Sequence, residues 1–118
     1  MRKDSSTNTL NRNKIHVNCG MAYTLDLIGG RWKPTILWAL LDGKLRYSEL
    51  KKSIPDVSER ILVLQLRELE KDGLIKRLVY AEVPPRVEYE LTNDGESMKH
   101  MLQIISDWGD LHRPKKAN

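Results

Sequence analysis

The stretch LRYSELKKSIPDVSERILVLQLRELEKDGLI, residues 45–75, decides the fold of this 118-residue chain. Its pattern predicts a short helix over residues 46–53 and a proline-containing turn over residues 54–57. A longer basic helix then starts at Ser58, a good N-cap residue, and stops at Gly73. The stretch therefore predicts two helices joined by a tight turn.

A short hairpin follows these two helices. Residues 75–80 and 87–91 have strand composition, and Pro84-Pro85 stiffens the loop between them. Helix, turn, helix and hairpin in this order are typical of winged helix-turn-helix domains, which insert the second helix into a DNA major groove and lay the hairpin, or wing, beside it.

Three more helices complete the predicted domain. Residues 21–28 form a short helix that glycines end, with glycine in the left-handed cap conformation. Residues 33–41 form a second helix, and residues 93–112 a long last helix capped by Thr92. We expect an α+β winged helix-turn-helix with about five helices, a two-stranded wing and a long C-terminal dimerisation helix. The expected organisation is a disordered arm at 1–14, one domain at 15–112 and a flexible tail at 113–118.

The helix that starts after Ser58 has two chemically different faces. At 100° per residue, three of its leucines gather on one side, and its basic residues lie with the fourth leucine on the other. The inward set is Leu62, Leu66 and Leu69, and the outward set is Arg60, Leu64, Arg67 and Lys71. A solvated helix face is the ordinary explanation of such a set, and we adopt it for Lys71. For Arg60 and Arg67, between a helix-turn and a hairpin, the pattern favours contact with guanine edges or phosphates.

Further candidate DNA contacts lie around this helix. Arg86 follows the rigid Pro84-Pro85 loop, so the hairpin turn is expected to present it to a minor groove or to flanking phosphates. An exposed loop arginine, which is common, is the ordinary alternative. The complete set of expected DNA-contacting residues is Arg46, Ser58, Arg60, Val63, Leu64, Arg67 and Arg86.

The charge distribution makes any DNA surface a local patch. The chain carries a net charge of +4, but residues 19–111 hold 13 basic and 15 acidic side chains, so the excess positive charge lies in the two ends. A protein-binding winged helix without DNA binding is the alternative function. A steep loss of duplex binding with rising salt would separate the two, because only DNA binding releases phosphate counterions.

Other classes of function find no support in the sequence. It contains no glycine-rich phosphate loop and no nucleophile elbow, so we expect neither an enzyme nor a cofactor. His16 and Cys19 are three residues apart without a second ligand pair, so we expect no metal. No apolar run is long enough for a membrane span or a signal peptide, and the single cysteine suits a reducing cytoplasm.

Four motifs make the chain resemble the HxlR family of winged-helix regulators, relatives of the MarR type. They are IGGRW at 28–32, RYSEL at 46–50, LRELEKDGLI at 66–75 and EVPPRVEY at 82–89. The resemblance extends over residues 19–108, and the last motif is the most specific. The chain departs from the family at Val63 and Leu64, where Ser or Thr and then Gln are frequent. Both apolar side chains suit a thymine methyl group instead.

The resemblance implies a cytoplasmic homodimeric transcription factor, more often a repressor than an activator, that binds inverted-repeat operators. It also implies that the first and last helices form the dimer interface. The apolar stripe of the last helix is larger than such a small core requires, which agrees with this arrangement. The expected interface residues are Tyr23, Leu27, Met101, Ile105 and Trp108.

The only cysteine, Cys19, directly precedes the first predicted helix. The helix dipole favours a thiolate at that position. Several HxlR-like regulators use a cysteine near this position to sense oxidants or electrophiles, so the resemblance implies a redox-sensing role. Without a second cysteine in the chain, an oxidised Cys19 would pair with another subunit or a small thiol. A small buried residue that seats the helix is the alternative.

Overall fold

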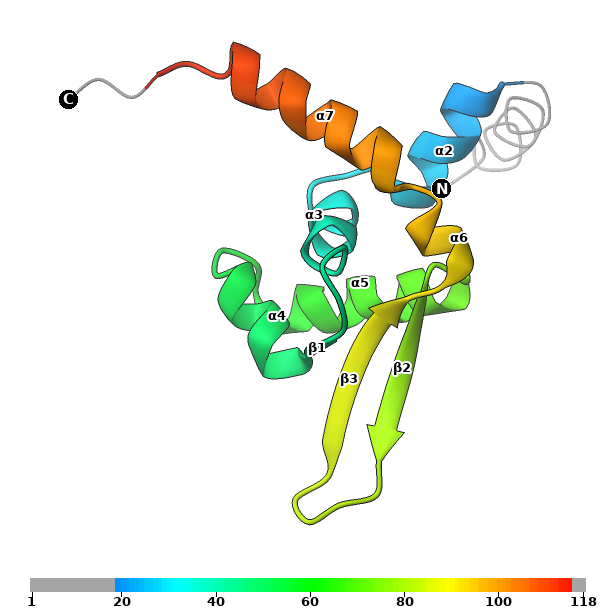
Figure 1. Cartoon of the computed structure of the whole chain (residues 1–118), viewed down its shortest axis with the longest axis vertical. Coiled ribbons are helices and arrows are strands. Elements are labelled where there is room, and N and C mark those ends of the chain that lie inside the picture. The colour runs from blue at the N-terminus through cyan, green and yellow to red at the C-terminus, as the bar shows by residue number, and fades with distance from the viewer. Residues whose placement is uncertain (1–18, 116–118) are drawn as a thin grey trace, which may run out of the picture. The chain divides into compact units, whose positions relative to one another are not determined.

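The computed structural model describes residues 19–115 (Figure 1). The predicted arm at 1–14 and the last three residues of the predicted tail lie outside the described residues. The helices are α2 (Gly20–Ile28), α3 (Trp32–Ala39), α4 (Tyr47–Ser53), α5 (Glu59–Lys71), α6 (Asn93–Glu96) and α7 (Lys99–His112), and the strands are β1 (Leu45–Arg46), β2 (Ile75–Tyr80) and β3 (Arg86–Leu91). None of these helices is long and apolar enough to cross a membrane.

Local hydrogen bonds define the helix-turn-helix formed by α4 and α5. The Glu49 carboxylate accepts the backbone N–H of Arg46 at 2.8 Å and so caps the start of α4. The Ser58 hydroxyl accepts the N–H of Ile61 at 3.1 Å at the start of α5, as its N-cap position predicts. These caps satisfy backbone donors that the first helical turns leave unpaired, so both helices begin at sharply defined residues.

The core lies where α3, α4, α5 and the sheet meet, and it is built almost entirely from leucine and isoleucine. Ile36 and Leu37 of α3, Leu50 of α4, and Leu62 and Leu69 of α5 are completely buried. Burying one such side chain stabilises the fold by about 1.5–3 kcal/mol. The prediction that Leu62, Leu66 and Leu69 face inward is confirmed. The opposite face of α5 is therefore the one that a partner can reach.

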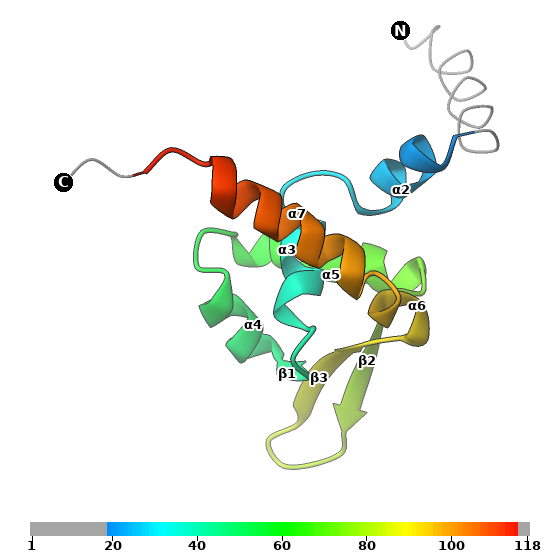
Figure 2. The ribbon, with the colours of Figure 1, turned by 45° about the horizontal axis from the view of Figure 1, so that its top comes forward.

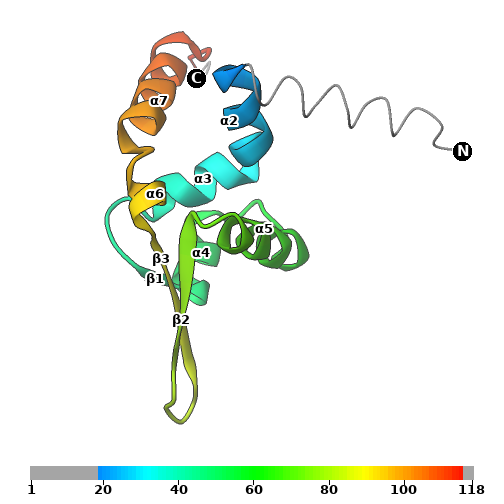
Figure 3. The same ribbon diagram turned by 90° about the vertical axis from the view of Figure 1, so that its right-hand side faces the viewer.

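The sheet has three strands in the order β1-β3-β2, all antiparallel. The β2–β3 hairpin, the predicted wing, extends beyond α4 and α5 (Figure 3). Strand β1 was not predicted, because the sequence pattern begins a helix at Arg46. Instead Leu45 and Arg46 pair with Tyr89 and Glu88 of β3, and the helix starts one residue later. Two residues are too few to show strand periodicity, so only this pairing defines β1.

The long C-terminal helix is interrupted near its start. One helix was predicted over 93–112, but a turn at Ser97 and Met98 separates α6 from α7. The hydroxyl of Thr92 donates to the carbonyl of Gly73 at 2.6 Å and accepts the N–H of Gly95 at 3.1 Å. A Cβ on Gly95 would collide with the carbonyl oxygen of Leu74. These contacts tie α6 to the residues directly before β2, and α7 begins after the turn.

Helix α2 begins after its N-cap Cys19 and ends at Gly29. Of the two glycines predicted to end this helix, Gly30 takes the left-handed conformation, with a φ of +93°, while Gly29 is extended with a φ of −65°. Gly29 is required for another reason: a Cβ there would collide with the carbonyl oxygen of Leu25. Both glycines therefore serve the end of α2, but through different physical effects.

Candidate nucleic-acid interface

The outward face of α5 carries two arginines with a leucine between them. Arg60, Leu64 and Arg67 are exposed, and Val63 is half-buried at the margin of the face. Leu66, on the opposite side of the helix, is only 1% exposed. Helix α5 thus combines an apolar anchor and a cationic front, the arrangement that a recognition helix needs.

The charges of these arginines are not neutralised by neighbouring carboxylates. Within residues 19–115, no ion pair engages Arg60 or Arg67. The neighbouring carboxylate of Glu68 instead binds the Nζ of Lys33 at 2.7 Å, which ties α5 to α3. Lys33 is largely buried, with 13% of its side chain exposed, so this pair orients the helix while leaving the two guanidinium groups available.

A groove on this face is lined by one residue of α4 and five of α5. Figure 2 shows the short turn that joins the two helices. The lining of the groove consists of Tyr47, Glu59, Arg60, Val63, Leu64 and Arg67. The Tyr47 hydroxyl donates to Glu59 Oε1 at 3.4 Å. Burial, followed by the charge of Glu59, raises the pKa of Tyr47 above its ordinary value. Tyr47 therefore stays a neutral hydrogen-bond donor at physiological pH.

Arg86 lies within the wing and not in its turn, which corrects the predicted position. It is the first residue of β3, and its guanidinium carbon stacks 4.1 Å from the ring centre of Tyr80, its partner across the strands. Its nitrogens pair with Glu82 at 3.3 Å and with Glu88 at 3.7 Å. The guanidinium thus binds the hairpin itself, because residues 80, 86 and 88 lie on the same face of the two strands.

Lys44 completes this cluster, although no pattern in the sequence indicates its role. Its Nζ donates to the Tyr80 hydroxyl at 3.4 Å and lies 3.8 Å from Glu88 Oε1. The hydrogen bond to Tyr80, more than the charge of Glu88, raises the pKa of Lys44. Lys44 and Tyr80 are 36 residues apart in the chain, and they meet because β1 and β2 both pair with β3.

The two remaining predicted contact residues, Arg46 and Ser58, have different surroundings. Arg46 is exposed and shares a surface depression with Arg86, lined also by Pro84 and Pro85 of the wing loop. The structure therefore brings the start of α4 and the wing to one site. Ser58, by contrast, uses its hydroxyl as the α5 cap, so that oxygen already has a hydrogen-bond donor.

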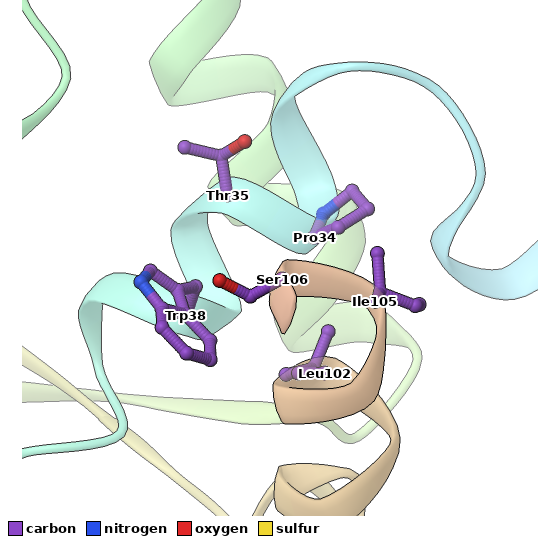
Figure 4. Close-up of a pocket in the computed structure, with 6 residues that line it drawn as sticks. All are labelled: Pro34, Thr35, Trp38, Leu102, Ile105 and Ser106. Atoms are coloured by element: carbon purple, nitrogen blue, oxygen red, sulfur yellow. The ribbon is translucent and has the colours of Figure 1, made fainter. Parts of the chain in front are cut away.

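The predicted interface residues on α7 include large exposed apolar side chains. Ile105 is 54% exposed and Trp108 64%, while Met101 is half-buried. Above the buried Leu102, a small apolar pocket opens between α3 and α7 (Figure 4). Its lining consists of Pro34, Thr35, Trp38, Leu102, Ile105 and Ser106. The apolar side chains of α7 therefore fall into two parts: Leu102 is buried beside α3, whereas Ile105 and Trp108 remain exposed.

On α2, Tyr23 is exposed and Leu27 half-buried. Cys19 is a free thiol at the N-terminus of this helix and is exposed in the single chain. In the part of the chain that the structure describes, no group of His, Cys, Asp and Glu side chains could hold a metal ion.

Comparisons with known proteins agree with this geometry. Residues 27–117 match the family model described as HxlR-like helix-turn-helix. The Bacillus subtilis HTH-type transcriptional regulator YdeP is 46% identical over 97 residues, which span 82% of this chain and 76% of YdeP. YtcD, another HTH-type transcriptional regulator of Bacillus subtilis, is 48% identical over 99 residues, which span 84% of this chain and 79% of YtcD.

Among solved structures, the redox regulator HypR in its oxidized form superposes with a TM-score of 0.78 at 42% identity, over 82% of this chain and 100% of that one. The relatives are transcriptional regulators, which confirms the prediction that the chain is not an enzyme. The family model covers most of the chain, including the whole helix-turn-helix and the wing. This chain therefore belongs to the HxlR-like helix-turn-helix family of transcriptional regulators.

Proposed function

We propose that the protein binds duplex DNA with α5 in the major groove and the β2–β3 wing beside it. The observation that carries this proposal is the exposed Arg60-Leu64-Arg67 face of α5, which is backed by buried leucines and free of carboxylate partners among the described residues. Arg60 and Arg67 contact guanine edges or phosphates, and Val63 and Leu64 face the bases between them.

The residues at either end of the helix-turn-helix assist in this binding. Arg46 lies beside the wing loop and contacts a phosphate. Ser58 lies near the DNA but acts mainly through its cap of α5. Arg86 orders the wing by pairing with Glu82 and Glu88 and by stacking on Tyr80. Only the part of its positive charge that the two carboxylates do not neutralise attracts the DNA.

The protein acts as a homodimer on inverted-repeat operators and represses transcription. A two-fold dimer places two α5 helices in successive major grooves, which matches a palindromic site. The exposed Ile105 and Trp108 of α7, with Met101 beside them, supply one part of the interface, and Tyr23 and Leu27 of α2 supply another. Because its ligand is the genomic duplex, the protein works in the cytoplasm.

Cys19 makes the regulator responsive to oxidants or electrophiles. The exposed thiol at the α2 N-terminus supports this role, and the similar protein HypR is described as a redox regulator. Cys19 forms a disulfide either with the Cys19 thiol of the other protomer or with a small thiol. In both cases the oxidant takes up the two electrons and two protons that the two thiols release. The change at the start of α2 then alters operator affinity.

A salt titration tests the central claim. Anisotropy of a labelled duplex from the promoter beside the protein's own gene is measured between 50 and about 300 mM salt. Binding that weakens steeply with salt supports the proposal. The double variant Arg60→Ala/Arg67→Ala should lose about two phosphate-equivalents of slope, while Lys99→Ala on α7 should behave like the parent protein. Absence of duplex binding at low salt would favour the protein-interaction alternative.

The sensor is tested by adding diamide to the same titration. Operator affinity should change in the parent protein and return with reductant, whereas Cys19→Ser should not respond. A response that persists in Cys19→Ser contradicts the sensor role.

Sedimentation of the protein and of the variant Trp108→Glu tests the dimer. A glutamate buried in the interface should separate the dimer into monomers.

A further inference from the structure

We propose that Leu64 reads a thymine methyl group in each operator half-site, with Arg60 and Arg67 holding the DNA on either side of it. This inference rests on the proposed DNA binding and names the base that the centre of the recognition helix selects. No other large apolar side chain of α5 is exposed: Leu64 is 46% exposed, while Leu62, Leu66 and Leu69 are buried.

The spacing along α5 places Leu64 between the two cationic groups. Arg60 lies four residues before it and Arg67 three residues after it, so all three share one face of the helix. With a rise of 1.5 Å per residue, their backbone positions lie about 6 Å and about 4.5 Å from that of Leu64 along the axis. The long arginines reach outward to phosphates or guanines, and the short leucine meets the base edge that comes closest to the helix.

The surroundings of Leu64 favour an apolar partner. Val63 and the ring of Tyr47 line the same groove, and the Tyr47 hydroxyl is already engaged by Glu59. Apolar side chains thus line this groove together with two guanidinium groups and the Glu59 carboxylate, which accepts the Tyr47 hydroxyl. Arg60 and Arg67 complement the phosphates that flank a base pair, so the occupant is a base edge of duplex DNA.

Base chemistry then selects thymine. In the major groove, thymine presents a methyl group beside its O4 acceptor, whereas guanine, adenine and cytosine present hydrogen-bonding groups without a methyl group. Leu64 cannot satisfy those groups, so a polar edge pressed against it loses its water without a replacement. Leu64 thus favours thymine by contact and disfavours the other bases by leaving their polar groups unpaired.

The test uses a duplex that the protein itself selects from a random-sequence library. In the selected inverted repeat, each thymine is replaced in turn by deoxyuridine, which removes only the methyl group and keeps all base pairing. We expect one symmetric thymine position where this replacement weakens binding about four-fold per half-site, as expected for one lost apolar carbon contact. Replacement of thymines outside the half-sites is the DNA control.

Two variants assign the effect to a side chain. Leu64→Ala should bind the thymine and uracil duplexes equally, because it lacks the group that contacts the methyl. Alanine is a strong helix former at an exposed position, and the circular dichroism spectrum verifies that α5 persists. Arg60→Ala should bind both duplexes more weakly yet keep the penalty for uracil, which separates general DNA contact from methyl recognition.

Two results would overturn the inference while the proposed function stands: a selected duplex that tolerates uracil at every position, or a uracil penalty of equal size in Leu64→Ala. Failure to select any duplex would overturn the DNA-binding proposal together with this inference. A uracil penalty that is lost in Leu64→Ala and kept in Arg60→Ala supports it.

Discussion

The recognition helix α5 and the wing both carry arginine, but they use it differently. On α5, Arg60 and Arg67 are exposed and have no carboxylate partner in the part of the chain described. On the wing, Arg86 is 30% exposed and is shared between Glu82 and Glu88 while it stacks on Tyr80. One region keeps its positive charge available to a partner, and the other uses it to hold two strands together.

This difference follows from how each element is stabilised. Helix α5 is fixed by leucines buried on its far side and by the Lys33–Glu68 pair, so its front needs no internal contact. The hairpin extends past the core and has few buried side chains to fix it, and cross-strand pairs are then the main source of order. An arginine is thus free for DNA only where other residues stabilise the element that carries it.

The largest expected effect separates the two faces of α5. Leu66→Ala removes a buried side chain and should lower the free energy of unfolding by about 2–5 kcal/mol. Leu64→Ala, two residues away on the exposed face, should change it by about 0.5 kcal/mol or less. Urea denaturation measures both. Equal losses would mean that the front of α5 also supports the fold, and the division between its faces would be wrong.

The next effect compares arginines of the two regions. Arg67→Ala should weaken duplex binding about ten- to hundred-fold and lower the salt slope by about one phosphate. Arg86→Ala should leave the salt slope nearly unchanged, because its charge is already compensated, and should act through a less ordered wing. Anisotropy titrations at several salt concentrations measure both quantities. A similar fall in slope for the two variants would make Arg86 a direct phosphate contact.

A smaller effect should appear when the wing arginine is partly released. Glu82→Gln removes one of the two carboxylates that bind Arg86 and should strengthen duplex binding about two- to five-fold at low salt. Glu90→Gln is the matched control, since Glu90 pairs with Lys76 on the same hairpin but not with Arg86. If Glu82→Gln bound DNA no better than Glu90→Gln, the carboxylates would not limit what Arg86 contributes.

The smallest effect is a pH dependence at the edge of α5. Burial and Glu59 raise the pKa of Tyr47, so the folded protein holds this proton more tightly than the unfolded chain. The stabilisation is fully present below about pH 10, the ordinary pKa of tyrosine, and is lost as the pH rises through the higher folded value. Urea denaturation from pH 8 to 11 should show a smaller alkaline loss of stability in Tyr47→Phe. Parallel profiles would contradict this assignment.

Much of the fold follows from patterns within short segments. The leucine spacing in α5, the Ser58 cap and the stop at Gly73 each predict what the structure contains. The break between α6 and α7 escaped prediction. The contacts that hold α6, from Thr92 to Gly73 and from Gly95 to Leu74, join segments about twenty residues apart in the chain. The same distinction holds for the candidate site. The basic face of α5 was predictable from the sequence, whereas the contacts of Arg86 with Tyr80 and Glu88 depend on how the two strands pair.

The helix-turn-helix, the basic front of α5 and the family can be predicted from the amino-acid sequence, because periodicity, caps and motifs are properties of neighbouring residues. Three features require the folded chain: β1 joins the sheet, Lys44 meets Tyr80, and the wing arginine is bound while those of α5 have no ion pair within residues 19–115. These features depend on pairing between segments far apart in the chain. Whether a charge is free or compensated is set by its neighbours in space, which local sequence does not specify.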